Sequence, residues 1–271
     1  MRAKWKGCLL ILLLFILSGC GITDSDKSAA VRVAVLDSGI SPEKSLPIDE
    51  GWNYLDESIH TDDDIGHGTR IAEVICQYAP EAVIVPLKIS GDKQDTKPEE
   101  VIRAIYDAVD TYDCRVVCMA FSIPDSEELQ NAVEYAASNQ VILISAAGNL
   151  GETYKKNKML YPAAYDSVIG VGAVTENGEA ASYSQKNESV FVTAPASSLD
   201  GESQGTSYAA ARIAGICARR TWESPEEFEK YLMDEAEDRG ALGYDIEYGW
   251  GGLWIVSLTV LNIYTGAYSE V

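Results

Sequence analysis

The sequence predicts an α/β domain with a mostly parallel central sheet and helices on both faces. Short runs rich in Val and Ile alternate along the chain with amphipathic helical stretches. This alternation is typical of parallel strands that are joined by helices and covered on both sides. A chain of 271 residues, less a short leader, has the length of one large domain of this class, and no internal repeat interrupts it.

Six apolar runs are expected to form the strands. Each contains Val, and β-branched residues favour extended backbone. In chain order the runs are 31–36, 82–87, 115–121, 141–145, 168–174 and 190–193. The first run ends just before Asp37, so this carboxylate is expected at the carboxyl edge of the sheet.

Five helices are expected between and after these strands. The first runs from His67 to Tyr78 and places apolar side chains on one face. The others are expected to start at Pro98, at a capping box of Asp125 and Glu128, at Ser207, and at the Ser224-Pro225 pair. The helix from Ser207 consists largely of small residues and should end near Arg219.

Three short segments supply an Asp, a His and a Ser, each beside glycine. They are Asp37-Ser38-Gly39, Gly66-His67-Gly68 and Gly205-Thr206-Ser207. A serine nucleophile needs an imidazole to take its proton and a carboxylate to orient that imidazole. The chain has only two histidines, and the other one, His60, lies in an acidic loop that we interpret as surface.

The predicted positions of these residues also favour a shared site. Ligands of open parallel sheets bind beyond the carboxyl ends of the strands, where Asp37 and the Gly148-Asn149 pair are expected. His67 and Ser207 are expected at helix starts, and the positive end of the helix dipole stabilises negative charge that develops there. The separate elements should therefore converge on one edge of the sheet.

At these segments, and at Ser145-Ala146-Ala147-Gly148-Asn149, the chain resembles the subtilisin-like serine proteases, the subtilase family. That family has the same chain order of Asp, His and Ser. The resemblance extends from about Val31 to about Ser257 and implies peptide-bond hydrolysis through an acyl-enzyme. It implies that Ser207 is the nucleophile, His67 the general base and then acid, Asp37 the residue that orients His67, and Asn149 an oxyanion donor.

The resemblance also implies where a peptide substrate binds. Two extended segments should clamp it as an added strand, and Leu160 should lie at the floor of the pocket for the residue before the scissile bond. The clamping segments are Ala120-Phe121-Ser122 and Ala146-Ala147-Gly148. Ser122 stands where the family usually has Gly, and Leu160 where it often has Gly. We therefore expect a preference for small side chains in this pocket.

Other positions depart from the family pattern. Arg70 stands where a second His is usual, and Glu73 where Gly is usual. The calcium-binding loop that the family inserts after the first helix is missing, so we expect no metal and no other cofactor. Too few residues separate Cys20 from Asp37 for the usual propeptide. A catalytically weak or inactive lipoprotein that binds peptides therefore remains the alternative function.

The N-terminus resembles a bacterial lipoprotein signal peptide. A basic start is followed by a short apolar core, and Leu17-Ser18-Gly19-Cys20 resembles a lipobox. An ordinary secretory signal or an uncleaved anchor are the alternatives. The expected organisation is a signal peptide at 1–19, a polar tether at 20–30, a catalytic domain at 31–262 and a tail at 263–271. We expect lipidation at Cys20 and attachment to the extracytoplasmic face of the cell membrane.

Charge and cysteine content narrow the possible partners. A net charge of −21 argues against nucleic-acid binding and against electrostatic adhesion to anionic lipid. The expected partner is a peptide or protein substrate, and we expect a monomer. We interpret the acidic run 62–64 as a solvated surface. The cysteines beyond Cys20 are expected to be buried free thiols, and they are Cys76, Cys114, Cys118 and Cys217.

Overall fold

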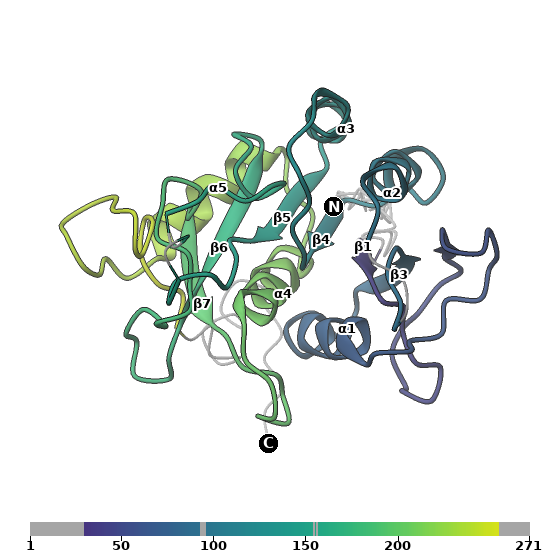
Figure 1. Ribbon diagram of the computed structural model, residues 1–271, viewed down its shortest axis with the longest axis horizontal. Helices are drawn as coiled ribbons and strands as arrows, with labels where there is room; N and C mark the ends of the chain where they lie inside the picture. The colour runs from purple at the N-terminus through teal and green to yellow at the C-terminus, as the bar shows by residue number, and fades with distance from the viewer. Residues whose placement is uncertain (1–29, 93–95, 154, 156, 255–271) are drawn as a thin grey trace, which may run out of the picture.

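The structure is a computed structural model that describes residues 30–92, 96–153, 155 and 157–254. Its sheet has seven parallel strands in the order β2-β3-β1-β4-β5-β6-β7. Figure 1 shows the part of this order from β3 to β7. The strands are β1 Arg32–Asp37, β2 Trp52–Asn53, β3 Val83–Lys88, β4 Val116–Met119, β5 Ile142–Ala146, β6 Val168–Val174 and β7 Val192–Pro195. The predicted fold class, an α/β domain with a parallel sheet, is confirmed.

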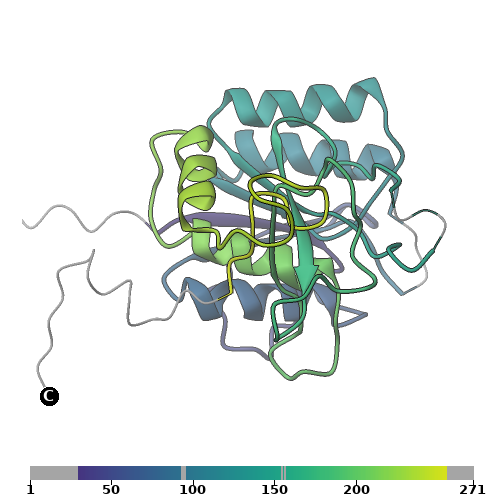
Figure 2. The same cartoon turned by 90° about the vertical axis from the view of Figure 1, so that its left-hand side faces the viewer.

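Five helices pack on this sheet in two layers. They are α1 His67–Tyr78, α2 Pro98–Asp110, α3 Glu127–Ser138, α4 Thr206–Cys217 and α5 Pro225–Glu235. Figure 2 shows α2 and α3 above the sheet and α1 and α4 below it. The core residues of α5 belong to the same apolar cluster as those of α1 and α4.

Strand β1 shows why the sheet needs both layers. Val33 and Val35 pack into the cluster formed with α1 and α4, whereas Ala34 and Leu36 pack into the cluster formed with α2 and α3. All four side chains are at most 2% exposed. Since successive residues of a strand face opposite sides, a strand buried on both sides must be apolar throughout.

Helices α1 and α4 lie against each other at a glycine. A Cβ at Gly215 of α4 would lie 2.7 Å from Cβ of Tyr78 and 2.8 Å from the carbonyl oxygen of Ile75 on α1. A side chain at this position would push the helices apart. The close packing of the two helices helps to place their N-terminal residues, His67 and Ser207, in one region.

The sequence predicted the elements better than their ends. The expected capping box at Asp125 is wrong, because Ser126 caps α3 by accepting a hydrogen bond from the backbone N–H of Leu129 at 3.1 Å. Asp125 instead accepts a bond from the Tyr165 hydroxyl at 2.7 Å. The run 115–121 forms a strand only as far as Met119, and the last strand begins at Val192 rather than at 190.

The four cysteines of the described domain are free thiols. Cys114, Cys118 and Cys217 are buried, and Cys76 is partly buried. Burial raises the pKa of Cys76 to about 11 and that of Cys114 to about 12, so neither thiol is ionised at neutral pH. No helix in the described part of the chain is long and apolar enough to cross a bilayer.

Candidate active site

Asp37, the last residue of β1, and His67, the first residue of α1, lie at ion-pair distance from each other. Nδ1 of His67 lies 2.8 Å from Oδ1 and 2.9 Å from Oδ2 of Asp37. The backbone N–H of Ser38 donates to Oδ1 of Asp37 at 2.7 Å and fixes the carboxylate. A Cβ at Gly68 would lie 2.3 Å from the carbonyl oxygen of Gly39, so only glycine lets α1 start this close to Asp37.

The surroundings of His67 raise its pKa above the ordinary value of 6.5. Partial burial alone would lower the pKa, but the hydrogen bond and the charge of Asp37, with the charge of Asp63, outweigh burial. The folded protein therefore binds this proton more tightly than the unfolded chain. The proton stabilises the fold at low pH, and this contribution is lost as the pH rises through the raised pKa of His67.

Ser207 is the second residue of α4 and is 8% exposed. Its hydroxyl donates a hydrogen bond to the carbonyl oxygen of Ala120 at 3.3 Å. The next residue, Tyr208, has its ring centroid 5.9 Å from that of His67, so the N-termini of α1 and α4 are neighbours. In this resting arrangement the Ser207 hydroxyl faces Ala120, and a bond to His67 is expected to form when substrate binds.

Thr206 fixes the side chain of Asn149. Oδ1 of Asn149 accepts hydrogen bonds from the Thr206 backbone N–H at 2.9 Å and from its hydroxyl at 3.0 Å. The same hydroxyl accepts a bond from the N–H of Gly148 at 3.1 Å. Because Oδ1 is held in this way, the Nδ2 amide of Asn149 is left to donate to a bound group. Thr206 is fully buried and was missed as a site residue.

A cleft of about 180 Å³ joins Ser207, Thr206 and Asn149 to the expected substrate segments, whereas His67 and Asp37 do not line it. The predicted residues that line it are Ser207, Asn149, Ala120, Phe121, Ser122, Ala146, Gly148 and Leu160. Ala147 does not line the cleft. Its side chain is fully buried, and its backbone N–H donates to the carbonyl oxygen of Val171 in β6 at 3.0 Å, directly after the end of β5.

The whole arrangement lies within a region that known sequences match. The sequence model of the subtilase family covers residues 28–251. The chain belongs to the subtilase family. This subtilase is 31% identical over 235 residues to the major intracellular serine protease of Bacillus subtilis strain 168, covering 77% of this chain and 73% of that one. The family match and this relative assign this subtilase to the enzyme class of the serine endopeptidases.

Other relatives extend the comparison. The minor extracellular protease Epr of the same strain is 30% identical over 264 residues, which are 89% of this subtilase and 40% of Epr. The chain thus spans less than half the length of that relative. A crystal structure of a lanthipeptide protease superposes with a TM-score of 0.72 and 26% identity, covering 82% of this chain and 85% of that one. A cold adapted subtilisin-like serine proteinase gives 0.70 and 23%, covering 82% and 86%, and shows the same fold.

Leu160 of this subtilase packs directly beside Gly148 in the cleft. An ideal Cβ on Gly148 would lie 2.3 Å from Cδ1 of Leu160, so the leucine fills space beside the clamping segment. We expect Leu160→Gly to raise kcat/KM for aromatic residues before the scissile bond about tenfold relative to Ala, because pocket volume limits large side chains. A peptide-library profile checks this, with the exposed Leu242→Gly as control. A wild-type profile dominated by Phe would contradict it.

The interpretation of 62–64 as a solvated run is wrong for Asp63. Its carboxylate accepts bonds from the N–H of Gly66 at 2.7 Å, from the N–H of Thr69 at 2.8 Å and from the hydroxyl of Ser38 at 2.8 Å. Burial raises the pKa of Asp63, but these bonds outweigh it and leave the pKa below its ordinary value. Asp63 therefore fastens the start of α1 to the end of β1.

A buried lysine holds the same loop from the other side. Lys88, at the end of β3, is 3% exposed. Its Nζ donates to the carbonyl oxygens of Ser38 at 2.9 Å and Asp62 at 2.5 Å, and to the carboxylate of Asp64 at 2.8 Å. Lys88 was missed as a site residue, because its partners lie in the segment 38–64 and meet the end of β3 only in the folded chain.

The unusual residues of α1 face the surface rather than the cleft. Arg70 lies 3.5 Å from a carboxylate oxygen of Asp200, and Glu73 lies 2.6 Å from Nζ of Lys44. His60 is exposed, as interpreted from the sequence. Within the described ranges, no group of three or more His, Cys, Asp or Glu side chains is arranged to hold a metal ion.

Proposed function

We propose that this subtilase cleaves peptide bonds through an acyl-enzyme on Ser207. The observation that carries the proposal is the bidentate hold of Asp37 on His67 Nδ1 beside a cleft that contains Ser207 and Asn149. With Nδ1–H donated to Asp37, the lone pair of Nε2 is available to accept a proton.

The reaction has two halves. The Ser207 oxygen attacks the carbonyl carbon of the scissile bond while His67 takes the hydroxyl proton. The oxyanion accepts hydrogen bonds from Nδ2 of Asn149 and the backbone N–H of Ser207. Collapse expels the amine, which takes the proton from His67 and leaves an ester on Ser207. A water molecule then attacks the ester by the same proton transfers and releases the acid.

A fluorophosphonate tests this function directly. We expect the purified protein to be labelled at Ser207 alone, as located by mass spectrometry. Ser207→Ala should abolish labelling and His67→Ala should slow it by orders of magnitude, because each removes the nucleophile or its base. Ser138→Ala, an exposed serine on α3, is the matched control and should label normally. A folded but unlabelled wild type would favour the peptide-binding lipoprotein instead.

Lipid anchoring at Cys20 is the second part of the proposal. The lipobox-like segment lies outside the described residues, and its support is the sequence alone. Two or three acyl chains on one cysteine would hold the domain durably on the extracytoplasmic face of the membrane. Wild-type protein should then begin at Cys20 and enter the detergent phase in a partition assay. Cys20→Ala should stay in the aqueous phase or keep its signal, and a wild type that starts elsewhere would exclude this anchor.

A narrow processing role fits the site better than general digestion. The cleft is small, and Leu160 is one of the side chains that limit its volume. One structural neighbour, 26% identical to this chain, is named a lanthipeptide protease. We therefore favour maturation of an exported peptide as the biological role.

A further inference from the structure

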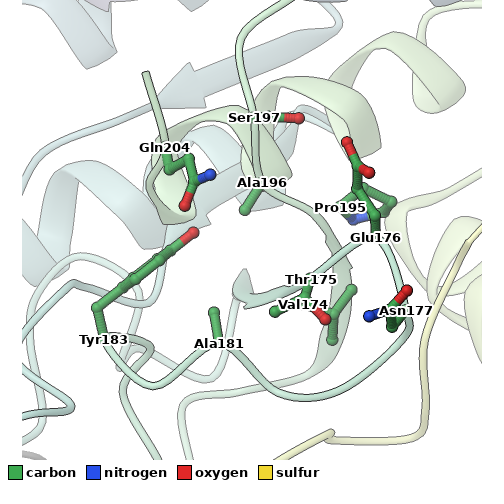
Figure 3. Close-up of a pocket in the computed structure, with 10 residues that line it drawn as sticks. All are labelled: Val174, Thr175, Glu176, Asn177, Ala181, Tyr183, Pro195, Ala196, Ser197 and Gln204. Atoms are coloured by element: carbon green, nitrogen blue, oxygen red, sulfur yellow. The ribbon is translucent and has the colours of Figure 1, made fainter. Parts of the chain in front are cut away.

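A second cavity of about 280 Å³ opens at the carboxyl ends of β6 and β7, apart from the cleft that holds Ser207. Its floor is apolar, since Val174, Ala181 and Ala196 are 2%, 2% and 4% exposed. Its rim is polar. Figure 3 shows the Tyr183 hydroxyl and the Gln204 amide on one side of the opening and the Glu176 carboxylate on the other.

Two of its walls border the reaction site. Gln204 precedes Ser207 by three residues in the chain. The carbonyl oxygen of Tyr183 accepts a bond at 2.7 Å from the N–H of Gly151, two residues after Asn149. The Ser207 cleft lies beyond β4 and β5, whereas this cavity lies beyond β6 and β7 along the same edge. A peptide that fills the Ser207 cleft before its scissile bond therefore directs the following residues toward this cavity.

The lining fits one kind of side chain. A volume just below the range of drug-sized sites suits a single side chain. Lys and Arg lay their methylene stems on apolar surface and keep the charged head at the wet rim. Glu176 supplies the opposite charge there, and none of the salt bridges between described residues uses it. The net charge of −21 favours the approach of cationic peptides as well.

We propose that this cavity is a specificity subsite for a basic side chain two or three residues after the scissile bond, with Glu176 as its charge partner. The proposal rests on the proposed function of Ser207. The subsite would select the part of the substrate after the scissile bond, which is released first as the amine product. This selectivity would be independent of the residue that binds in the Ser207 cleft.

An acyl-transfer assay measures selectivity for the residues after the scissile bond separately from selectivity for the residues before it. A small ester substrate forms one common acyl-enzyme, and a peptide amide then competes with water for it. The peptide amine forms the new amide bond, the bond between the acyl carbon and Ser207 Oγ breaks, and the amine proton returns to Ser207 through His67. Gly-Lys-amide is compared with Gly-norleucine-amide, and Gly-Gly-Lys-amide with Gly-Gly-norleucine-amide. Each pair differs in charge at nearly constant shape.

The expected result is a two- to fivefold preference for Lys in at least one pair, because partly exposed ion pairs are modest in strength. The preference should fall at high salt. Glu176→Gln should abolish the preference for Lys. Glu176→Lys should instead favour the peptide amide that carries Glu at the same position. Glu179→Gln is the matched control, since Glu179 is also exposed and lies on the same loop but is not among the residues that line the cavity. A preference that is absent, that survives Glu176→Gln, or that Glu179→Gln abolishes equally would overturn the proposal.

A binding measurement separates this inference from the proposed function. The same peptide amides are titrated into Ser207→Ala protein and followed by NMR. Tighter binding of the Lys peptide that depends on Glu176 supports the subsite even if fluorophosphonate labelling fails, in which case the hydrolytic function alone is wrong. Normal labelling and ester hydrolysis without any Lys preference would instead reject the subsite and keep the hydrolase.

Discussion

Asp37→Asn should lower kcat by about four orders of magnitude while leaving the fold intact. Both carboxylate oxygens of Asp37 can only accept a hydrogen bond from Nδ1–H of His67, at 2.8 and 2.9 Å, whereas the amide group of the variant can place its N–H donor against Nδ1 instead. The imidazole then carries its proton on Nε2, the nitrogen that must accept the serine proton. Loss of the orienting carboxylate costs about 10⁴ in kcat in serine proteases, including subtilisin.

The pH profile of the same variant gives an independent readout. In the wild type, activity should rise with pH as His67 loses its proton, at a pKa above 6.5 because Asp37 raises it. Without the charge of Asp37, the pKa of His67 falls, so the acid limb of the residual activity moves to lower pH. Asp49→Asn removes an exposed carboxylate that is paired with Arg32 and should change neither quantity. An unshifted acid limb in Asp37→Asn would contradict the assignment.

Asn149→Asp should lower kcat by about 10² to 10³ with little change in KM. Removing one oxyanion donor has this cost, a magnitude known from subtilisin itself. The carboxylate can still accept both hydrogen bonds from Thr206, so the local structure has no reason to change. What disappears is the Nδ2 donor, and a negative charge now faces the developing oxyanion.

Asn149→Ala provides the second comparison for this prediction. It also removes the donor, but it leaves the buried N–H and hydroxyl of Thr206 without their acceptor, so its melting temperature should fall whereas that of Asn149→Asp should not. Asn139→Ala, at the exposed end of α3, is the matched control for both. Full activity in either variant at position 149 would remove Asn149 from the mechanism.

The sheet was predictable because its strands are buried on both faces and are therefore apolar throughout. Strand β2 escaped prediction, since two residues carry no periodic signal. The start of α3 was misplaced by one residue because Asp125 and Ser126 are equally good caps by composition. Which of the two residues caps the helix depends on Tyr165, 40 residues away, whose hydroxyl donates a hydrogen bond to the Asp125 carboxylate.

The site was predictable where chemistry restricts residue type and not where position alone matters. Two histidines leave little choice of base, and the glycines beside His67 reflect close backbone approach. Asp63 and Lys88 could not be identified, because their roles come from three segments that meet only in the folded chain. Ala147 does not line the cleft that its neighbours Ala146 and Gly148 line, because alternate residues of an extended segment point to opposite sides.

If Cys20 carries a lipid as proposed, the parallel sheet would determine which end of the domain faces the membrane. The chain enters β1 at Arg32 on the amino edge, whereas Asp37 ends the same strand on the opposite edge. A lipid on Cys20 would connect to Ala30 through ten residues, which reach at most about 35 Å when fully extended. The bilayer would therefore lie at the end of the domain opposite the cleft, and the mouth of the cleft would open toward the medium, from which the proposed peptide substrate would enter.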